Sequence, residues 1–286
     1  MSLSAPTGGT KGTKKMAGTI NPNGVVVWQG ASLIDGAPIA VILTGLKNPS
    51  GNGKTGDMLQ TWIIRADVAP IEAVASGEDE SICGNCPHRR RLHTEVRYRG
   101  RGKNRRAEIV KVWRRTCYVN VGQGPRGVYE CFARGGYLPI TDPRAMAWVL
   151  RAVLRALRIG SYGDPGAVPG EVWAWLVSLL QPTTRTGYTH QWRVRPDLIG
   201  LCMASCDSPQ DVADATAQGW RCFHVRPVGG EAPRGQVHCP SDPSGTVHVS
   251  CADCGQCSGA GGKYGRNVWI WAHGTAKNFV KELAVV

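Results

Sequence analysis

Four cysteines near the C-terminus have a spacing typical of a metal-binding site. Cys251, Cys254 and Cys257 are each separated by two residues, and Cys239 lies twelve residues before the first of them, in a segment rich in Gly and Pro. Packing does not require this spacing, whereas a chain that surrounds a metal ion or cluster with thiolates does. Zinc would take the four thiolates in a closed tetrahedral site, and a [4Fe–4S] cluster would take the same four. The sequence therefore predicts a metal centre and leaves its identity open.

A second set of cysteines lies earlier in the chain. Cys83 and Cys86 form a Cys-x2-Cys knuckle, and Cys117 is the predicted third ligand. Three thiolates around zinc leave a position for water, and three around an iron–sulfur cluster leave one iron open to a substrate or cofactor. The alternative for Cys117 is a buried thiol. A fourth ligand is either absent or one of three residues: Cys131, His88 and His93.

The composition indicates a folded protein with reduced thiols. The chain has 286 residues, 42% of them hydrophobic, and no apolar run approaches the roughly 20 residues that a membrane span needs. Residues 1–24 lack the apolar core of a secretory signal and are rich in Gly, Thr, Ser and Lys, so we expect a disordered basic tail, a cytoplasmic location and no membrane partner. Eleven cysteines then favour metal binding over disulfides, with Cys202, Cys206 and Cys222 interpreted as buried apolar side chains.

The positive charge is concentrated in one segment. The net charge of the chain is +13, and twelve Lys or Arg residues face only Glu95 and Glu108 between His88 and Arg115, a local excess of ten. Such a patch is typical of a nucleic-acid partner, although a solvated flexible loop is the alternative. The candidate nucleic-acid-binding residues are Arg89, Arg90, Arg91, Arg97, Arg99, Arg101, Lys103, Arg105, Arg106, Arg114 and Arg115.

The first half of the chain predicts a β-rich unit, residues 25–135. Strands are expected at 25–28 and 40–44, a short helix at 67–76, and a strand that begins or ends at Cys117. The segment 48–55 resembles a phosphate-binding loop, but its first Gly is missing and a β-rich stretch follows it instead of a helix. We therefore expect a β-hairpin there.

The second half, residues 136–286, alternates between strand and helix. Helices are expected at 142–156, 171–180, 207–217 and 278–285, and strands at 157–163, 186–192, 198–205, 220–225 and 268–274. This alternation predicts parallel βαβ units, which with the β-rich part form a single α/β domain over 25–286. The predicted fold is a mostly parallel sheet or a partial (β/α) barrel with a Cys-rich, metal-binding C-terminal insertion.

Polar residues follow several of these strands. In parallel sheets, active-site residues lie at the carboxyl ends of the strands. These polar residues therefore predict a shared pocket. Any one of them could instead cap a turn or a helix or be a core histidine. The candidate catalytic residues are Asp164, His190, Asp207 and His273, with proton transfer as the role of the histidines.

The order of the motifs resembles that of a known family. The motifs are Cys83-x2-Cys86-Pro, Cys117-Tyr118, Arg158-Ile-Gly-Ser-Tyr-Gly-Asp-Pro165, Thr186-Gly-Tyr-Thr-His-Gln-Trp192, Ala204-Ser-Cys-Asp207, Cys251-x2-Cys254-x2-Cys257 and Ala272-His-Gly274. Over residues 40–280 the chain resembles poorly characterised cysteine-rich proteins of phages and plasmids. More distantly it is similar to phage proteins with a radical-SAM-like partial (β/α) barrel.

This resemblance implies roles for several residues. Cys83, Cys86 and Cys117 would be cluster ligands, Asp164 would line the mouth of the barrel, and the four C-terminal cysteines would hold an auxiliary cluster. S-adenosylmethionine is the implied cofactor. Radical-SAM proteins carry three cysteines in one C-x3-C-x2-C loop, whereas here Cys117 follows Cys86 by thirty-one residues.

Two functional hypotheses follow. One is a metal-dependent enzyme of a phage or mobile element, with iron–sulfur or zinc centres and a nucleic-acid or nucleotide substrate. The other is a non-catalytic, zinc-stabilised nucleic-acid-binding protein. The oligomeric state is open.

Overall fold

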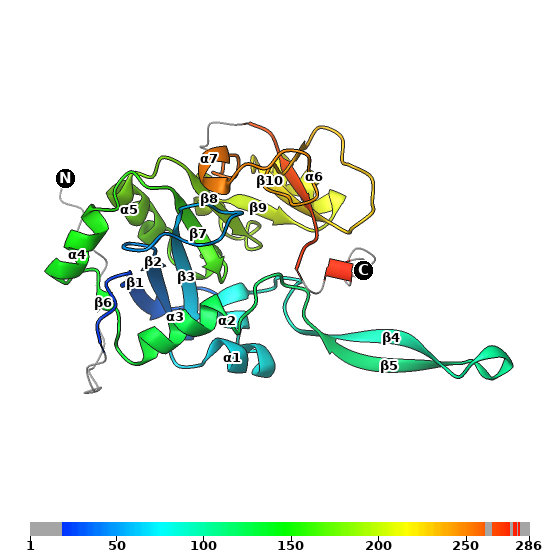
Figure 1. Cartoon of the computed structure of the whole chain (residues 1–286). Coiled ribbons are helices and arrows are strands. Elements are labelled where there is room, and N and C mark those ends of the chain that lie inside the picture. Colours follow the sequence, from blue (N-terminus) through cyan, green and yellow to red (C-terminus); the bar gives the residue numbers. More distant parts are fainter. Residues whose placement is uncertain (1–18, 261–264, 275–276, 279, 281–286) are drawn as a thin grey trace.

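The computed structural model describes residues 19–260, 265–274, 277–278 and 280. Most of the expected tail and most of the expected final helix lie outside these residues. The described part is a mixed α/β structure built on a ten-stranded, mostly parallel sheet with the order β11-β12-β10-β9-β8-β7-β3-β2-β1-β6 (Figure 1). The α/β class and the mostly parallel sheet are confirmed. None of the helices in these ranges has the length and hydropathy to cross a lipid bilayer.

The N-terminal part supplies an antiparallel section of this sheet. Strands β1 (Gly24–Ala31), β2 (Pro38–Thr44) and β3 (Leu59–Arg65) pair in sequence order, and β6 (Leu138–Pro139) adds to β1 in parallel. The segment 48–55 lies in the loop between β2 and β3, with no helix after it, so the hairpin prediction is confirmed.

Three short helices surround β3. They are α1 (Pro70–Ser76), α2 (Glu80–Cys83) and α3 (Gly124–Ala133). Helix α3 starts directly against the sheet, since a Cβ on Gly124 would lie 2.7 Å from the Trp62 ring. Cys131 is buried in α3. Cys117 neither begins nor ends a strand, because the chain between β5 and α3 forms no ladder there, which corrects that expectation.

The second half provides the parallel strands and their helices. They are α4 (Pro143–Leu150), β7 (Leu157–Tyr162), α5 (Gly170–Leu180), β8 (Arg185–Thr189), β9 (Met203–Cys206), α6 (Pro209–Ala217), β10 (Cys222–Arg226), β11 (Val237–His238), α7 (Cys251–Cys254) and β12 (Val268–Trp271). The Asp142 side chain caps α4, as expected, by accepting from Arg144 N at 2.8 Å. The helix ends at Leu150 instead of 156, since Leu154 has a left-handed φ of 66° and its N–H donates to Leu180 O.

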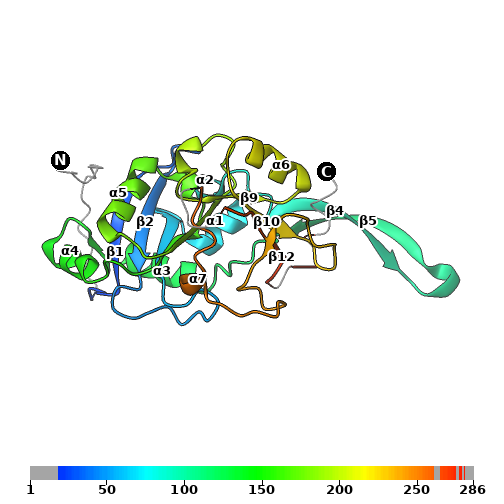
Figure 2. The same ribbon diagram turned by 90° about the horizontal axis from the view of Figure 1, so that it is seen from above.

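The parallel strands present different side chains to their two faces. Helices α5 and α6 lie on one side of the sheet and α3 and α7 on the other (Figure 2). Cys222 faces α6, with its Sγ 3.7 Å from Val212 O and 3.6 Å from Thr216 Oγ1. Cys202, Cys206 and Cys222 are all buried, which confirms their interpretation as interior side chains.

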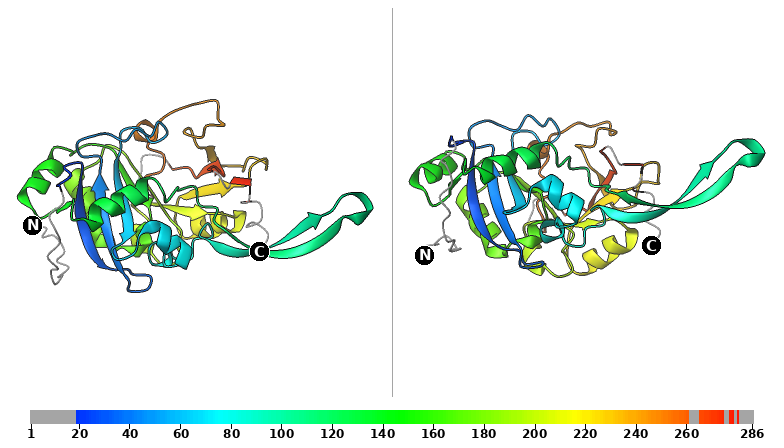
Figure 3. Two further views of the ribbon diagram at one scale, coloured as in Figure 1. Left: turned by 60° about the horizontal axis from the view of Figure 1, so that its bottom comes forward. Right: turned by 90° about the horizontal axis from the view of Figure 1, so that it is seen from below.

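The basic segment is a regular β-hairpin and not a loop. Strands β4 (Arg91–Arg99) and β5 (Arg106–Arg114) pair antiparallel, with the short 3-10 helix η1 (Gly102–Asn104) at the tip. This hairpin, residues 91–114, is called the arm below. It projects far from the body of the molecule in every view (Figures 1 and 3).

A substitution in the turn after β7 can test the packing at the edge of the parallel strands. Gly163 has a φ of 78°, and a Cβ there would lie 2.6 Å from Ile63 Cβ and 2.8 Å from Ile63 O. Gly163→Ala should therefore cost more than the roughly 1–2 kcal/mol of a left-handed alanine. Gly36→Ala is the matched control, because its φ is 79° and a Cβ there would meet nothing within 4 Å. Equal losses in chemical denaturation would contradict this packing.

Candidate metal-binding cavity

The first cysteine knuckle is held by the end of β8. Gly84 follows α2 with a φ of 56°, and it lies against the Gln191 side chain so closely that a Cβ would collide with the amide. Gln191 Nε2 donates to Cys83 O at 3.4 Å and to Asn85 Oδ1 at 3.0 Å. The knuckle between Cys83 and Cys86 is therefore fixed by a residue more than a hundred positions away.

The arm brings Cys117 back to this knuckle. Cys117 N donates to His88 O at 3.0 Å, just below the first residues of the arm, and Arg115 Nη1 donates to Val119 O at 2.7 Å. Cys83 has its pKa raised well above the usual range by burial, with the neighbouring Cys86 and Cys117 adding to the effect. The thirty residues that separate Cys86 from Cys117 in the sequence are mostly the two strands of the arm.

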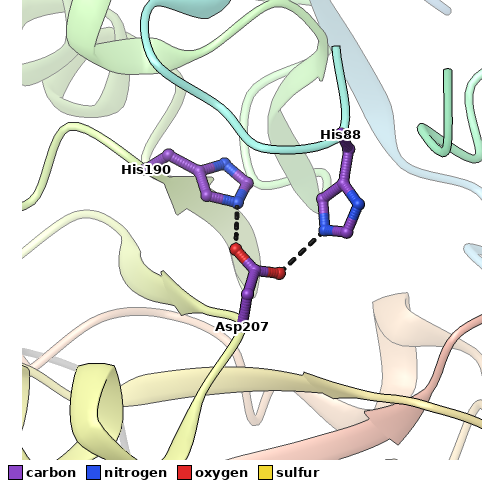
Figure 4. A group of neighbouring side chains, drawn as sticks. All are labelled: His88, His190 and Asp207. Carbon is purple, nitrogen blue, oxygen red and sulfur yellow. Dashed lines mark hydrogen bonds and ion pairs between the residues drawn. The ribbon is translucent and has the colours of Figure 1, made fainter. Parts of the chain in front are cut away.

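His88, Asp207 and His190 form a group of neighbouring side chains (Figure 4). Asp207 Oδ1 is 2.7 Å from His88 Nε2, and Asp207 Oδ2 is 3.1 Å from His190 Nε2. Cys86 Sγ is 4.0 Å from the same His190 nitrogen. Among the described residues this is the one group of three or more Cys, His, Asp or Glu whose ligand atoms all lie within 4.8 Å of one another. It could hold a single divalent cation.

The side chains of this group shift one another's pKa values. Burial favours the neutral acid at Asp207, but His190 and His88 outweigh it and hold the pKa of Asp207 well below its usual range. Burial likewise opposes protonation of His190, whereas Cys86 and Asp207 raise its pKa well above the ordinary value. His190 and Asp207 directly follow β8 and β9, as the sequence predicts. His88 comes from the base of the arm.

Asp164 holds neighbouring groups in place through hydrogen bonds. Its carboxylate accepts hydrogen bonds from Thr189 Oγ1 at 2.6 Å, Gly166 N at 2.7 Å and His190 N at 2.7 Å. Burial nevertheless raises the pKa of Asp164. The carboxylate lines the cavity and also fixes the backbone from which His190 projects, and its catalytic role stays a prediction.

The C-terminal cysteine set is attached to the body by backbone hydrogen bonds. The one-turn helix α7 is capped by Ser250, whose Oγ accepts from Asp253 N at 3.3 Å. Cys251 N donates to Lys54 O and Ala252 N donates to Thr55 O, each at 3.0 Å. The loop that resembled a phosphate-binding motif is therefore the platform for this set.

The four C-terminal sulfurs share one electrostatic environment. Burial raises the pKa of Cys239 to about 11, and Cys251 and Cys254 contribute to the rise. Burial also raises the pKa of Cys257, with contributions from the other three cysteines of the set. Cys239 N is fixed to β12 by donation to Trp269 O at 2.8 Å. That these four residues bind one metal centre stays a prediction.

Both cysteine sets line one cavity of about 380 Å³. Its floor is formed by side chains of the parallel strands, among them Thr186, Tyr188, Ser205 and Phe223. The cysteines that line it are Cys83, Cys86, Cys117, Cys239, Cys251, Cys254 and Cys257. Of the candidates for a fourth ligand to the first set, His88 lines the cavity, whereas Cys131 and His93 do not.

Cationic and aromatic groups line the same cavity. Lys54 Nζ is 3.3 Å from His273 Nε2, and Arg158 Nη2 donates to Tyr118 Oη at 2.8 Å. The rings of Tyr118 and His273 have centroids 4.8 Å apart. Of these four residues, only His273 was a candidate site residue from the sequence. The alternation of β7, which turns Arg158 and Gly160 to the same face, was the signal that could have found Arg158.

The basic residues of the predicted patch have different environments. Arg89 is bound inside the body, where Nε is 3.0 Å and Nη2 is 2.9 Å from Asp79 Oδ1, and it also donates to the carbonyls of Gly77 and Gly84. Arg115 supports the Cys117 loop. Of the eleven candidate nucleic-acid-binding residues, the exposed ones are Arg91, Arg97, Arg99, Arg101, Lys103, Arg105 and Arg106.

Comparison with known proteins identifies no relative. No family model matches the sequence, no curated protein matches it, and no solved structure matches the fold. The resemblance to phage- and plasmid-borne cysteine-rich proteins therefore stays a prediction.

Arg89 should matter for stability. Its side chain is 12% exposed and that of Asp79 is 3% exposed, so Arg89→Ala would leave a buried carboxylate unpaired. We expect a loss of about 3 kcal/mol in the free energy of unfolding. Arg97→Ala removes a side chain that is 52% exposed and should cost less than about 1 kcal/mol. Similar small losses for both, measured by chemical denaturation, would refute the anchoring role of Arg89.

His273 should make stability depend on pH. Burial, together with Lys54, lowers the pKa of His273 to about 4 from 6.5. Because the folded-state pKa is depressed, the stabilisation is fully present above about pH 6.5 and is lost as the pH falls through about 4. Unfolding free energies measured at about pH 7 and about pH 4.5 should differ more for the natural protein than for His273→Gln. An identical pH dependence would mean that His273 is not neutral in the folded state.

Proposed function

We propose that this protein is a metal-cluster-dependent enzyme. Its cavity would bind either a free nucleotide or one nucleotide of a nucleic acid. One observation carries the proposal. Two cysteine sets with metal-ligand spacing, far apart in the sequence, line a single cavity together with cationic side chains. A purely structural zinc site is closed by its ligands and does not need to share a cavity with a second set.

The donor set suits a cluster better than a single zinc ion in either cysteine group. Four thiolates around one zinc ion would lie roughly 3.8 Å from one another, given a Zn–S bond of about 2.3 Å. No three cysteine sulfurs in the described part of the chain come within 4.8 Å of each other. In a cluster each thiolate binds a different iron, so the sulfurs stand farther apart. Cys83, Cys86 and Cys117 would hold one cluster, and Cys239, Cys251, Cys254 and Cys257 the other.

The rest of the cavity suits a small anionic substrate with a flat ring. Lys54 and Arg158 are cations in a mainly apolar space, where a phosphate would satisfy them. Tyr188 and Phe223, with ring centroids 4.4 Å apart, form an aromatic wall against which a base could pack. The volume of about 380 Å³ lies in the range of ligand pockets.

A bound iron–sulfur cluster would supply electrons to this cavity. The chain's own residues would bind the phosphate, orient the base and exclude water. His273, which is neutral because its pKa is low, could accept a proton from the substrate. The order of the parallel strands is compatible with a partial (β/α) barrel, and S-adenosylmethionine is the cofactor that the distant similarity to radical-SAM-like proteins would add.

A second candidate function rests on the His88–Asp207–His190 group. Two imidazoles and a carboxylate within 4.8 Å are a common ligand set for one divalent cation. A zinc ion there would tie the base of the arm to the ends of β8 and β9. The protein would then be a zinc-stabilised nucleic-acid-binding protein with no reaction of its own.

Metal analysis after anaerobic purification tests the proposal. We expect a brown protein that contains iron and acid-labile sulfide in amounts that account for two clusters. Cys86→Ser and Cys254→Ser should each remove the iron of one cluster, because each substitution deletes a ligand of a different set. Cys131→Ala is the matched control, since Cys131 is buried, free and outside the cavity.

The alternatives give different results in the same experiment. A colourless protein with one zinc, lost in His190→Ala and kept in both serine variants, would support the second candidate and reject the cluster enzyme. Iron that survives both serine substitutions would also overturn the assigned ligands.

A further inference from the structure

The arm has an exposed apolar face. In its cross-strand register Leu92 lies opposite Trp113, Val96 opposite Ile109, and Tyr98 opposite Ala107, so all these side chains share one face of the ribbon. Ile109 is 75% exposed, Tyr98 60% and Trp113 57%. An isolated two-stranded hairpin is marginally stable in water, and a contiguous apolar patch of this kind marks a binding surface.

Three arginines on the opposite face of the arm form ion pairs within the arm. Arg99 lies 2.8 Å from Glu108, Arg97 lies 3.7 Å from Glu95, and Arg114 also pairs with Glu95. These contacts use both acidic residues of the arm. The apolar face is thus the one that lacks a covering partner within the described chain.

The charge of the arm selects among possible partners. Residues 91–114 contain nine Lys or Arg and two Glu, a net charge of +7. Two copies of such an arm would repel each other, which argues against a dimer formed through this face. The glycine-rich tip adds the exposed cations Arg101, Lys103 and Arg105. Charge complementarity therefore favours a polyanion.

The two exposed rings indicate which polyanion. Arg105 lies over the Tyr98 ring at 4.0 Å and Arg90 over the Trp113 ring at 4.5 Å, so each ring has a guanidinium beside it. The rings are six strand positions apart, or roughly 20 Å along the ribbon. Aromatic rings combined with cations along a track are typical of surfaces that bind unpaired nucleotides, whose bases can stack. A duplex hides its base faces and could use only the charges.

The arm grows directly out of the cavity wall. His88 and Thr116, which flank the arm, both line the cavity, and His88 Nδ1 is 2.9 Å from Thr116 Oγ1. Cys86 and Cys117 lie just outside these two residues. A nucleic-acid strand bound along the arm would therefore have one end at the first cysteine set.

We propose that the apolar face of the arm binds an unpaired stretch of nucleic acid and leads one of its nucleotides into the cavity. This inference rests on the proposed function and names its substrate class. Tyr98 and Trp113 stack bases, and the cations of the arm contact the phosphates.

Fluorescence anisotropy with a labelled single strand and with the same strand in a duplex tests the proposal on the full-length, metal-loaded protein. The single strand should bind more tightly than the duplex. Tyr98→Ala and Trp113→Ala should each weaken single-strand binding roughly tenfold and leave duplex binding almost unchanged. Tyr98→Phe should retain binding, because the ring still stacks. Lys111→Ala should weaken both and reduce the salt dependence, because Lys111 is exposed and lies opposite Thr94 on the apolar face.

Two controls and a metal assay separate the possible outcomes. Leu33→Ala removes an apolar side chain that is 54% exposed in the β1–β2 turn, and Arg151→Ala removes an exposed cation that follows α4, at the other end of the molecule from the arm (Figure 1). Both should bind like the natural protein. Metal content and thermal unfolding of every variant show whether it is folded and loaded.

The proposal is overturned if duplex binds as tightly as single strand, if ring removal has no effect, or if no oligonucleotide binds because the face takes a protein. In each of these cases the metal content reports separately on the cluster enzyme, which could stand without the arm's assignment.

Discussion

The parallel pairing of the central strands is the constraint on which the site depends. Parallel strands all end at the same edge of their sheet, so the residues that follow β7, β8 and β9 are brought together however far apart they are in the sequence. Asp164 makes this edge rigid, because its buried carboxylate accepts from Thr189 Oγ1, Gly166 N and His190 N. The backbone of His190 is fixed in this way, and its ring can then face Asp207.

The cavity combines groups that are unfavourable to bury without partners. Burial raises the pKa of Cys83 and Cys257 and lowers that of Lys54, so thiols and amine are each pushed toward their neutral forms. A metal centre would reverse this for the thiols, because it binds thiolates and releases their protons. A phosphate would likewise favour charged Lys54.

The arm combines two tasks in one segment. Its two strands carry the chain away from Cys86 and return it at Cys117, so an unusually long spacing in the sequence becomes a short separation in space. Arg89 and Arg115 hold the base of this excursion through protein partners. The cationic side chains farther along the ribbon do not hold the base of the arm. One basic segment thus divides into an anchor and an exposed surface.

Local pattern determined much of the fold. The strands β1, β2 and β3, the helix capped by Asp142 and the strand–helix alternation could all be predicted, since periodicity and caps act over a few residues. Helix α4 is shorter than its pattern predicts, because the turn at Leu154 is held by a hydrogen bond to Leu180. Such long-range contacts leave no local signal.

The sequence by itself determined the class of the fold, the two cysteine sets as candidate ligands and the concentration of positive charge, because composition and spacing are properties of the chain. Only the tertiary structure decided that both sets line one cavity, that His88 joins His190 on Asp207, and that Lys54 and Arg158 line the same cavity. It also made the basic segment a ribbon with one apolar face. The physical reason is that these relations depend on strand order and register, which are set by the packing of the whole chain.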